Sequence, residues 1–399
     1  MNSAVPSETP DQSLTDGSKL TTMVNQQLNF LTRTDEPGYN VERSDVLLTA
    51  VSILMRLASL ALTVMLSYQY YKTERLNYFA LTLAALIVPA IITALLNLLM
   101  YIEDTRLKRC ATQPCHSILL CVVLMPFLCR YWRSLRLSHA CYRAKAQGDP
   151  LEQKRLYEQL VQEDNDVALL RIFECLLEVT TQKILQLTIV LSTGPIMLLQ
   201  MLSIISAMGS IAWCMASHYR CVRFARPDKR HIPWSGTIVQ IAWQFAVTVA
   251  RVLAIATVAS VFPLYTGLAC CCHALLMAVW IFFYERPCFC GDSTAQRLFL
   301  SSAFGLVYIF NYIPLHEGPT RLRYSLFYSL CFAETIACAV LYALFVRNPT
   351  IRQSAFCTTV LCGFPTATFM IGVSLMLFFY TYCHPNITSR QRDTDQATE

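Results

Sequence analysis

The amino-acid sequence predicts an all-α polytopic membrane protein, with eight transmembrane helices and two re-entrant helices in two pseudo-symmetric halves. Hydrophobic residues make up 55% of the chain and charged residues only 15%, against roughly 25% charged residues in ordinary soluble domains. Apolar runs that exceed the roughly 18 residues of a membrane-spanning helix recur between Val46 and Tyr382. Arginine and lysine gather on one side of these runs, and this asymmetry sets the predicted topology.

Eight apolar runs are long enough to cross the membrane as helices. They cover residues 46–71, 78–101, 167–191, 196–216, 237–260, 265–284, 325–346 and 357–382. Two further apolar stretches, 116–129 and 298–313, are short for a crossing, and basic residues flank each of them on both sides. Because both flanks are then expected in the cytoplasm, each stretch is predicted to enter the membrane and return.

This topology places both chain termini in the cytoplasm. The cytoplasmic loops then hold 19 of the lysine and arginine residues, whereas the outer loops hold four, namely Lys72, Arg75, Arg347 and Arg352. Asn386 begins an N-x-S/T match in the C-terminal tail, so glycosylation at this site would contradict the orientation.

The chain divides into a membrane domain and two polar tails. We predict disordered cytoplasmic tails at 1–45 and 384–399, because these segments are too polar to form a packed core. Within the membrane domain (46–383), each half repeats the same order of two spans, a re-entrant segment and two spans. The first half covers 46–216, the second half covers 237–383, and the basic cytoplasmic loops cover 130–166 and 217–236. Residues 146–166 are charged and predict an amphipathic helix that begins after Gly148 and Pro150.

The run 167–191 is apolar but carries five polar side chains at helical spacing. These residues, called the polar row below, are Arg171, Glu174, Glu178, Gln182 and Gln186. At about 100° per residue they share one face of a helix, whereas Lys183 does not. A charge at the centre of a lipid-facing helix costs about 2.5–3.5 kcal/mol. The polar row is therefore expected to face protein, water or a polar molecule that moves.

Three further charged residues lie inside predicted spans. Arg56 and Arg251 each belong to the first span of a half, and Glu334 belongs to the span equivalent to that of the polar row. We interpret these residues as companions of the polar row. Two interpretations remain open: the charges pair as static contacts between helices, or they line a path for a lipid headgroup, an ion or a small solute.

The sequence offers little support for an enzyme or an ATP-driven pump. It contains no P-loop, no HExxH and no GxSxG motif, and its isolated histidines are interpreted as packing or loop residues. Most of the 18 cysteines lie in apolar runs as packing residues. Loop cysteines near the membrane are candidates for palmitoylation, namely Cys110, Cys115, Cys288 and Cys290. We predict no catalytic residue, no metal site and no cofactor. We also predict no nucleic-acid partner, because the topology explains the net charge of +6.

Three segments of the chain resemble the XK-related family of phospholipid scramblases. They are LRIFECLLEVTTQKILQL around the polar row, RYWRSLRLSHACYRAK at 130–145 and FNYIPLHEGPTRLRYSLFYSLCFAETIACAVLYAL at 310–344. The resemblance extends over nearly all of the chain from about residue 46 to 383. It departs from the family pattern at Thr181 and Lys183, where the family more often has proline and an apolar residue.

The resemblance implies energy-independent movement of phospholipids between the leaflets of the plasma membrane, with headgroups following the polar row. It further implies exposure of phosphatidylserine in apoptosis, a single-pass membrane partner and activation by a caspase. Asp11 and Asp45 each follow a glutamate three positions earlier, a pattern that caspases favour. Two alternatives stay open: a solute or ion transporter, and a non-transporting subunit of a membrane complex. No lipid selectivity and no oligomeric state follow from the sequence.

Overall fold

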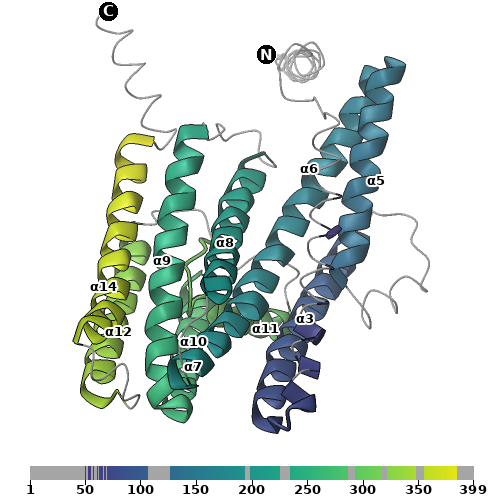
Figure 1. Cartoon of the computed structure of the whole chain (residues 1–399). Coiled ribbons are helices and arrows are strands. Elements are labelled where there is room, and N and C mark those ends of the chain that lie inside the picture. Colours follow the sequence, from purple (N-terminus) through teal and green to yellow (C-terminus); the bar gives the residue numbers. More distant parts are fainter. Residues whose placement is uncertain are drawn as a thin grey trace, which may run out of the picture.

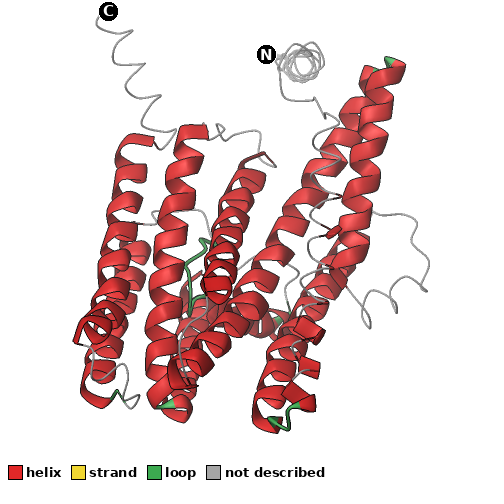
Figure 2. Ribbon diagram, in the orientation of Figure 1, coloured by secondary structure: helices red, strands yellow, loops and turns green. Residues whose placement is uncertain are grey.

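The structure is a computed structural model that describes residues 70–106, 126–193, 198–224, 234–285, 293–315, 321–346 and 355–383, together with single positions between 50 and 68. Every regular element in these residues is a helix (Figure 2). The elements are α3 (Leu76–Arg106), α5 (Pro126–Gln147), α6 (Pro150–Phe173), η1 (Glu174–Val179), α7 (Thr180–Thr193), α8 (Leu198–Phe224), α9 (Trp234–Val261), α10 (Pro263–Trp280), η2 (Ile281–Glu285), α11 (Thr294–Val307), α12 (Arg321–Phe345), α14 (Ala355–Phe378) and η3 (Phe379–Cys383). The three η elements are π-helical turns.

Six of the described helical segments are long and apolar enough to cross a membrane. They are Leu76–Ile102, Pro150–Ser192, Ser235–Val261, Pro263–Glu285, Arg321–Phe345 and Thr358–Cys383. Each contains most of one predicted span, and α8 covers the predicted span 196–216 from Leu198 onward. The all-helical, multi-pass architecture is therefore confirmed. The full number of eight spans stays a prediction, because most of the run 46–71 lies outside the described residues.

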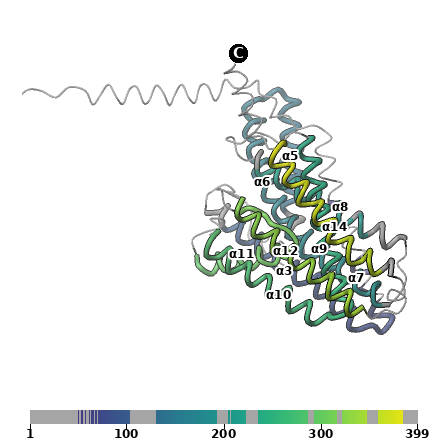
Figure 3. The backbone as a smooth tube through the Cα atoms, turned by 90° about the vertical axis from the view of Figure 1, so that its left-hand side faces the viewer, coloured from purple at the N-terminus to yellow at the C-terminus, as the bar shows by residue number. Residues whose placement is uncertain are grey.

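Helix α9 is the central helix of the bundle. Its apolar window is 72% buried, whereas those of the other candidate spans are 22–39% buried. It packs against α7, α8, α10, α12 and α14, and both views show it among these helices (Figures 1 and 3). Its side chains Trp243, Val247 and Ala250 are completely buried. Residues on α9 can therefore contact elements from both halves of the chain.

The short stretch 298–313 forms α11 and an irregular segment that follows it. At about 1.5 Å per residue, the 14 residues of α11 span about 21 Å, which is short for a bilayer crossing. The backbone from Tyr308 to Ile313 is not helical, yet these residues are buried. Irregular backbone at membrane depth requires such burial within protein. These features fit the predicted re-entrant segment. In the equivalent stretch 116–129, only the last residues are described, and they begin α5.

The basic segment 130–166 is a helical hairpin rather than an irregular loop. Gly148 has φ +73°, a left-handed conformation that glycine adopts without strain. Asp149 then caps α6, since its Oδ1 accepts hydrogen bonds from the backbone N–H groups of Leu151 (3.2 Å) and Glu152 (3.1 Å). Pro150 occupies the first turn of α6, where its missing N–H leaves no hydrogen bond unmade. The predicted start of this helix is confirmed.

Buried ion pairs hold the two arms of the hairpin together. Arg130 of α5 contacts Asp166 (2.9 Å) and Glu163 (3.5 Å) of α6, and Arg133 contacts Glu163 at 3.3 Å. Arg130 also donates to Asn97 of α3, at 2.7 Å, so the hairpin is fixed to the neighbouring span. Between the arms, burial raises the pKa of the Cys141 thiol, and a fully buried, protonated thiol is expected to be unreactive.

Helix α6 does not end before the predicted span at 167–191. The helical segment Pro150–Ser192 runs for 43 residues, through η1 and into α7. We expected a separate cytoplasmic helix at 146–166 and a span that begins near 167. The sequence between them contains neither proline nor glycine, so the helix continues without a break. The hairpin and the polar row thus share one helix.

Helices α10 and α11 pack closely at Gly305. A Cβ atom at this position would lie 2.5 Å from the carbonyl oxygen of Ala274 and 3.0 Å from the Cβ of Ala278. We predict that Gly305→Val lowers the thermal unfolding midpoint in detergent, since overpacking typically costs about 1–3 kcal/mol. Gly209→Ala in α8 is the control, because nothing lies within 4 Å of the added atom. An unchanged midpoint for Gly305→Val would contradict the close packing.

Candidate functional site

The polar row lies inside the protein. Glu174, Glu178 and Gln182 are buried, with exposed fractions of 4%, 3% and 9%, and Arg171 and Gln186 are partly buried. This placement agrees with the expectation that the row avoids lipid, because a carboxylate in hydrocarbon is costly. The row therefore faces the interior of the helix bundle.

A π-helical turn interrupts the regular helix within the polar row. Element η1 begins at Glu174 and includes Glu178, and the backbone N–H of Thr180 bonds to the carbonyl of Cys175, five residues earlier. The hydroxyl of Thr180 donates to the same carbonyl at 2.9 Å. π-Helical turns are rare and are frequent at functional sites. The wider π-helical turn changes the angle about the helix axis between the side chains of Glu174 and Glu178 from its α-helical value.

Neighbouring polar side chains extend the row. Thr63, from the predicted first span, donates a hydrogen bond to Gln182 Oε1 at 3.1 Å. Lys183 Nζ donates to Gln186 Oε1, also at 3.1 Å. Lys183 was expected to point away from the row, but this bond places its charge beside it. The Gln186 end of the row thus carries a cation, Lys183, where the resemblance leads one to expect an apolar residue.

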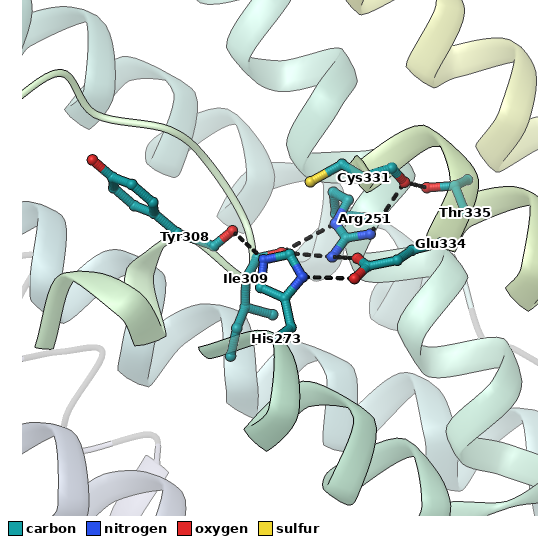
Figure 4. Close-up of polar contacts among 7 residues, drawn as sticks. All are labelled: Arg251, His273, Tyr308, Ile309, Cys331, Glu334 and Thr335. Carbon is teal, nitrogen blue, oxygen red and sulfur yellow. Dashed lines mark hydrogen bonds and ion pairs between the residues drawn. The ribbon is translucent and has the colours of Figure 1, made fainter. Parts of the chain in front are cut away.

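Arg251 and Glu334 form a second polar cluster (Figure 4). The Arg251 guanidinium donates to Glu334 Oε2 at 2.8 Å and twice to the carbonyl of Ile309, at 2.9 and 3.1 Å. His273 Nδ1 lies 2.6 Å from Glu334 Oε1, and its Nε2 lies 3.2 Å from the carbonyl of Tyr308. We call Arg251, His273 and Glu334 the charged triad. It joins α9, α10 and α12 to the irregular segment that follows α11.

The charged triad borders a cavity of about 340 Å³. Apolar residues of α9, α10 and α12 form most of its wall, among them Phe262 and Leu341. The Glu334 side chain is 32% exposed, whereas that of Arg251 is 3% exposed. A polar molecule in this cavity would therefore meet the carboxylate first.

A metal ion is a poor fit to this cluster. Ligand atoms of His273, Cys331 and Glu334 lie within 4.8 Å of one another, which is close enough for three ligands. However, the carboxylate of Glu334 already contacts Arg251 through one oxygen and His273 through the other. The guanidinium thus supplies the positive charge that an ion would bring, and the geometry favours an ion-pair network.

A further polar row lies on α9 and was missed in the sequence. It consists of Thr237, Gln240, Gln244, Thr248 and Arg251, all at most 3% exposed. The intervals of three and four residues place these side chains along one helix face. Applying the spacing criterion to uncharged Gln and Thr residues, as well as to charges, would have revealed this α9 row.

Several polar atoms of the α9 row have no hydrogen-bond partner in the described part of the chain. Gln244 Oε1 accepts a hydrogen bond from Asn311, in the irregular segment after α11. Gln240 Oε1, Gln244 Nε2 and Thr248 Oγ1 have no partner among the described residues. A buried polar group without a hydrogen bond costs about 1–3 kcal/mol. The α9 row is therefore suited to accept hydrogen bonds from, and donate them to, a polar molecule that enters the bundle.

Glu285 is another buried carboxylate that the sequence did not reveal. It is 1% exposed and accepts hydrogen bonds from Tyr308 (3.1 Å) and Tyr312 (2.7 Å). Arg323 lies 3.9 Å away. Since Glu285 stands next to Arg286 and directly after a predicted span, it looked like a loop residue. Its two tyrosine partners instead fix the end of η2 to the irregular segment that contains them.

The predicted site residues thus fall into three groups. Arg171, Glu174, Glu178, Gln182 and Gln186 lie along one continuous helix, and Arg251 and Glu334 contact each other. Arg56, Asp11 and Asp45 lie outside the described residues, as do Cys110, Cys115, Cys288, Cys290 and Asn386.

Comparison with known proteins finds matches that cover most of the chain. A family model described as XK-related protein matches residues 47–385. "XK-related protein 8" of Gasterosteus aculeatus is 24% identical over 270 residues, which are 67% of this chain and 63% of that protein. "Cell death abnormality protein 8" of Caenorhabditis briggsae is 26% identical over 280 residues, which are 67% of this chain and 59% of that protein. The chain therefore spans about three fifths of the length of these relatives.

Proposed function

Because the chain belongs to the XK-related family, we propose that it moves phospholipids between membrane leaflets without an energy source. The observation that carries this proposal is the buried polar row, with two carboxylates and an amide enclosed among helices. A phospholipid headgroup can exchange its hydration for such contacts while its acyl chains stay in lipid. The lipid gradient sets the direction, so the protein needs no ATP site and no catalytic residue.

The α9 row extends the proposed path. Helix α7, which carries Gln182 and Gln186, packs along α9, and α9 carries Gln240, Gln244 and Thr248 with polar atoms available for hydrogen bonds. Two rows on packed helices offer a headgroup successive partners on more than one side. The charged triad adds Arg251 and Glu334 to this path.

The biological setting that we propose is the exposure of phosphatidylserine at the plasma membrane during apoptosis. One relative carries the name cell death abnormality protein, which supports this role. A cytoplasmic caspase cut at Asp11 or Asp45 and a single-pass membrane partner belong to the same proposal. If the full-length protein stays intact in the presence of an executioner caspase, activation by cleavage is excluded.

Reconstitution into vesicles tests the proposed function. We expect fluorescent phospholipid in the inner leaflet to become accessible to a membrane-impermeant reducing agent, without ATP, only in vesicles that contain the protein. Solute flux without lipid movement would instead indicate a transporter, and the absence of both would indicate a subunit of a membrane complex. Empty vesicles and vesicles that contain an unrelated helical membrane protein serve as controls.

A further inference from the structure

Helix α5 presents an exposed face that combines an aromatic residue with basic ones. Trp132 is 65% exposed, and Arg136, His139 and Arg143 are also exposed. Their spacing of four, three and four residues places them along one side of the helix. We call these four residues the α5 outer face. The opposite side of α5 packs against α6 through Cys141 and the buried ion pairs of Arg130.

The charge of α5 is one-sided. Its 22 residues include Arg130, Arg133, Arg136, Arg143 and Lys145, and they include no aspartate or glutamate. Glu163 and Asp166 of α6 neutralise the first two of these cations. Arg136 and Arg143 make no ion pair within the part of the chain that the structure describes. Within the described ranges, the positive charge of the outer face is therefore not compensated.

The order of residues along α5 fits the border between lipid and water. The helix starts beside α3, at the level of the candidate spans, and its C-terminal end projects beyond the end of α9 (Figures 1 and 3). Tryptophan is enriched at membrane interfaces, and arginine side chains extend toward headgroups. The eleven helical rises between Trp132 and Arg143 cover about 16 Å, which is enough to reach from the edge of the hydrocarbon through the headgroup layer.

We propose that the α5 outer face binds the headgroups of anionic phospholipids in the cytoplasmic leaflet. Arg136 and Arg143 can each donate two hydrogen bonds to a phosphate, a geometry that a guanidinium provides and an ammonium does not. Trp132 packs against the upper part of the acyl chains. Charge complementarity favours this occupant, because anionic lipids are concentrated on the cytoplasmic side. The site binds lipid at the rim of the protein, apart from the polar row, and it does not depend on lipid transport.

Quenching of Trp132 by brominated lipids tests the proposal on the full-length protein in vesicles. The signal of Trp132 is the difference between the fluorescence of the wild type and that of Trp132→Phe. At equal mole fraction, dibrominated phosphatidylserine is expected to quench this signal at least about twofold more than dibrominated phosphatidylcholine, because each basic residue near the surface favours anionic lipid about fivefold. The preference is expected to decrease at high salt, where exposed charges are screened.

In the double variant Arg136→Gln/Arg143→Gln, the two brominated lipids are expected to quench the Trp132 signal equally. Arg155→Gln is the matched control, because Arg155 is an exposed arginine of the same hairpin that is paired with Glu152 on α6, and it should keep the preference. Size-exclusion profiles verify that the variants fold, which is expected because the altered side chains are exposed. Equal quenching in the wild type, or a preference that survives in the double variant, overturns the proposal and points to an acidic protein segment as the occupant.

Discussion

The double variant Glu174→Gln/Glu178→Gln is expected to move lipid between leaflets at least about tenfold more slowly than the wild type. Each glutamate is buried in the polar row and offers a carboxylate to a passing headgroup. A hydrogen bond to a charged group contributes about 1.5–3 kcal/mol, and each 1.4 kcal/mol lost at the top of the barrier slows the rate about tenfold. Glutamine keeps the size and removes the charge. The measurement is the rate at which labelled lipid becomes accessible in reconstituted vesicles, per folded protein.

The control for this experiment is Glu163→Gln, a buried glutamate of the same continuous helix. Glu163 pairs with Arg130 and Arg133 in the hairpin of α5 and α6, away from the polar row. We expect this variant to lower the thermal unfolding midpoint and to leave the rate per folded protein unchanged. A wild-type rate for Glu174→Gln/Glu178→Gln would show that the polar row only holds helices together.

Replacement of Arg251 by leucine is expected to destabilise the fold by about 3–5 kcal/mol, because it leaves the carboxylate of Glu334 without its cation. The carbonyls of Ile309 and Cys331 lose the hydrogen bonds that Arg251 donates to them at the same time. The stability of Arg251→Lys should lie between that of the wild type and that of Arg251→Leu. One ammonium cannot reproduce the planar guanidinium that reaches Ile309 and Glu334 together. The thermal unfolding midpoint in detergent, followed by tryptophan fluorescence, measures the order of the variants.

Thr335→Val is the control for the Arg251 series. The Thr335 hydroxyl is buried in the same region, but it bonds to the carbonyl of Cys331 within its own helix, at 2.8 Å. Its loss is expected to change the midpoint much less than either Arg251 variant. If Arg251→Leu unfolds at the wild-type temperature, the charged triad does not hold α9, α10 and α12 together.

Hydropathy and local turn signals were sufficient to predict most of the helices. The predicted spans 237–260 and 265–284 agree closely with Ser235–Val261 and Pro263–Glu285. Pro263 explains the boundary, because proline suits the first turn of α10 and cannot continue α9. The turn at Gly148 and Pro150 was predicted for a similar local reason. The continuity of α6 with α7 was missed, because a polar helix that runs into an apolar one leaves no breaking residue at the junction.

The sites were only partly visible in the sequence. Charged residues inside apolar runs are conspicuous, so Glu174, Arg251 and Glu334 were identified. Their partners were not, since the contacts of Glu334 with Arg251 and His273 join residues 83 and 61 positions apart. Local spacing contains no information about such tertiary neighbours. The π-helical turn η1 was also not predicted, because nothing in the residues Glu174–Val179 distinguishes it from an α-helix.

The helix that joins the hairpin to the polar row gives the protein a mechanical connection between its two regions. Forty-three residues at about 1.5 Å each form a rod about 64 Å long. A rod that is clamped to α5 at one end transmits tilt and rotation along its length. The softest point of such a rod is η1, where the regular ladder of backbone hydrogen bonds changes register. We therefore expect a force on the hairpin to change the angle about the helix axis between the side chains of Glu174 and Glu178.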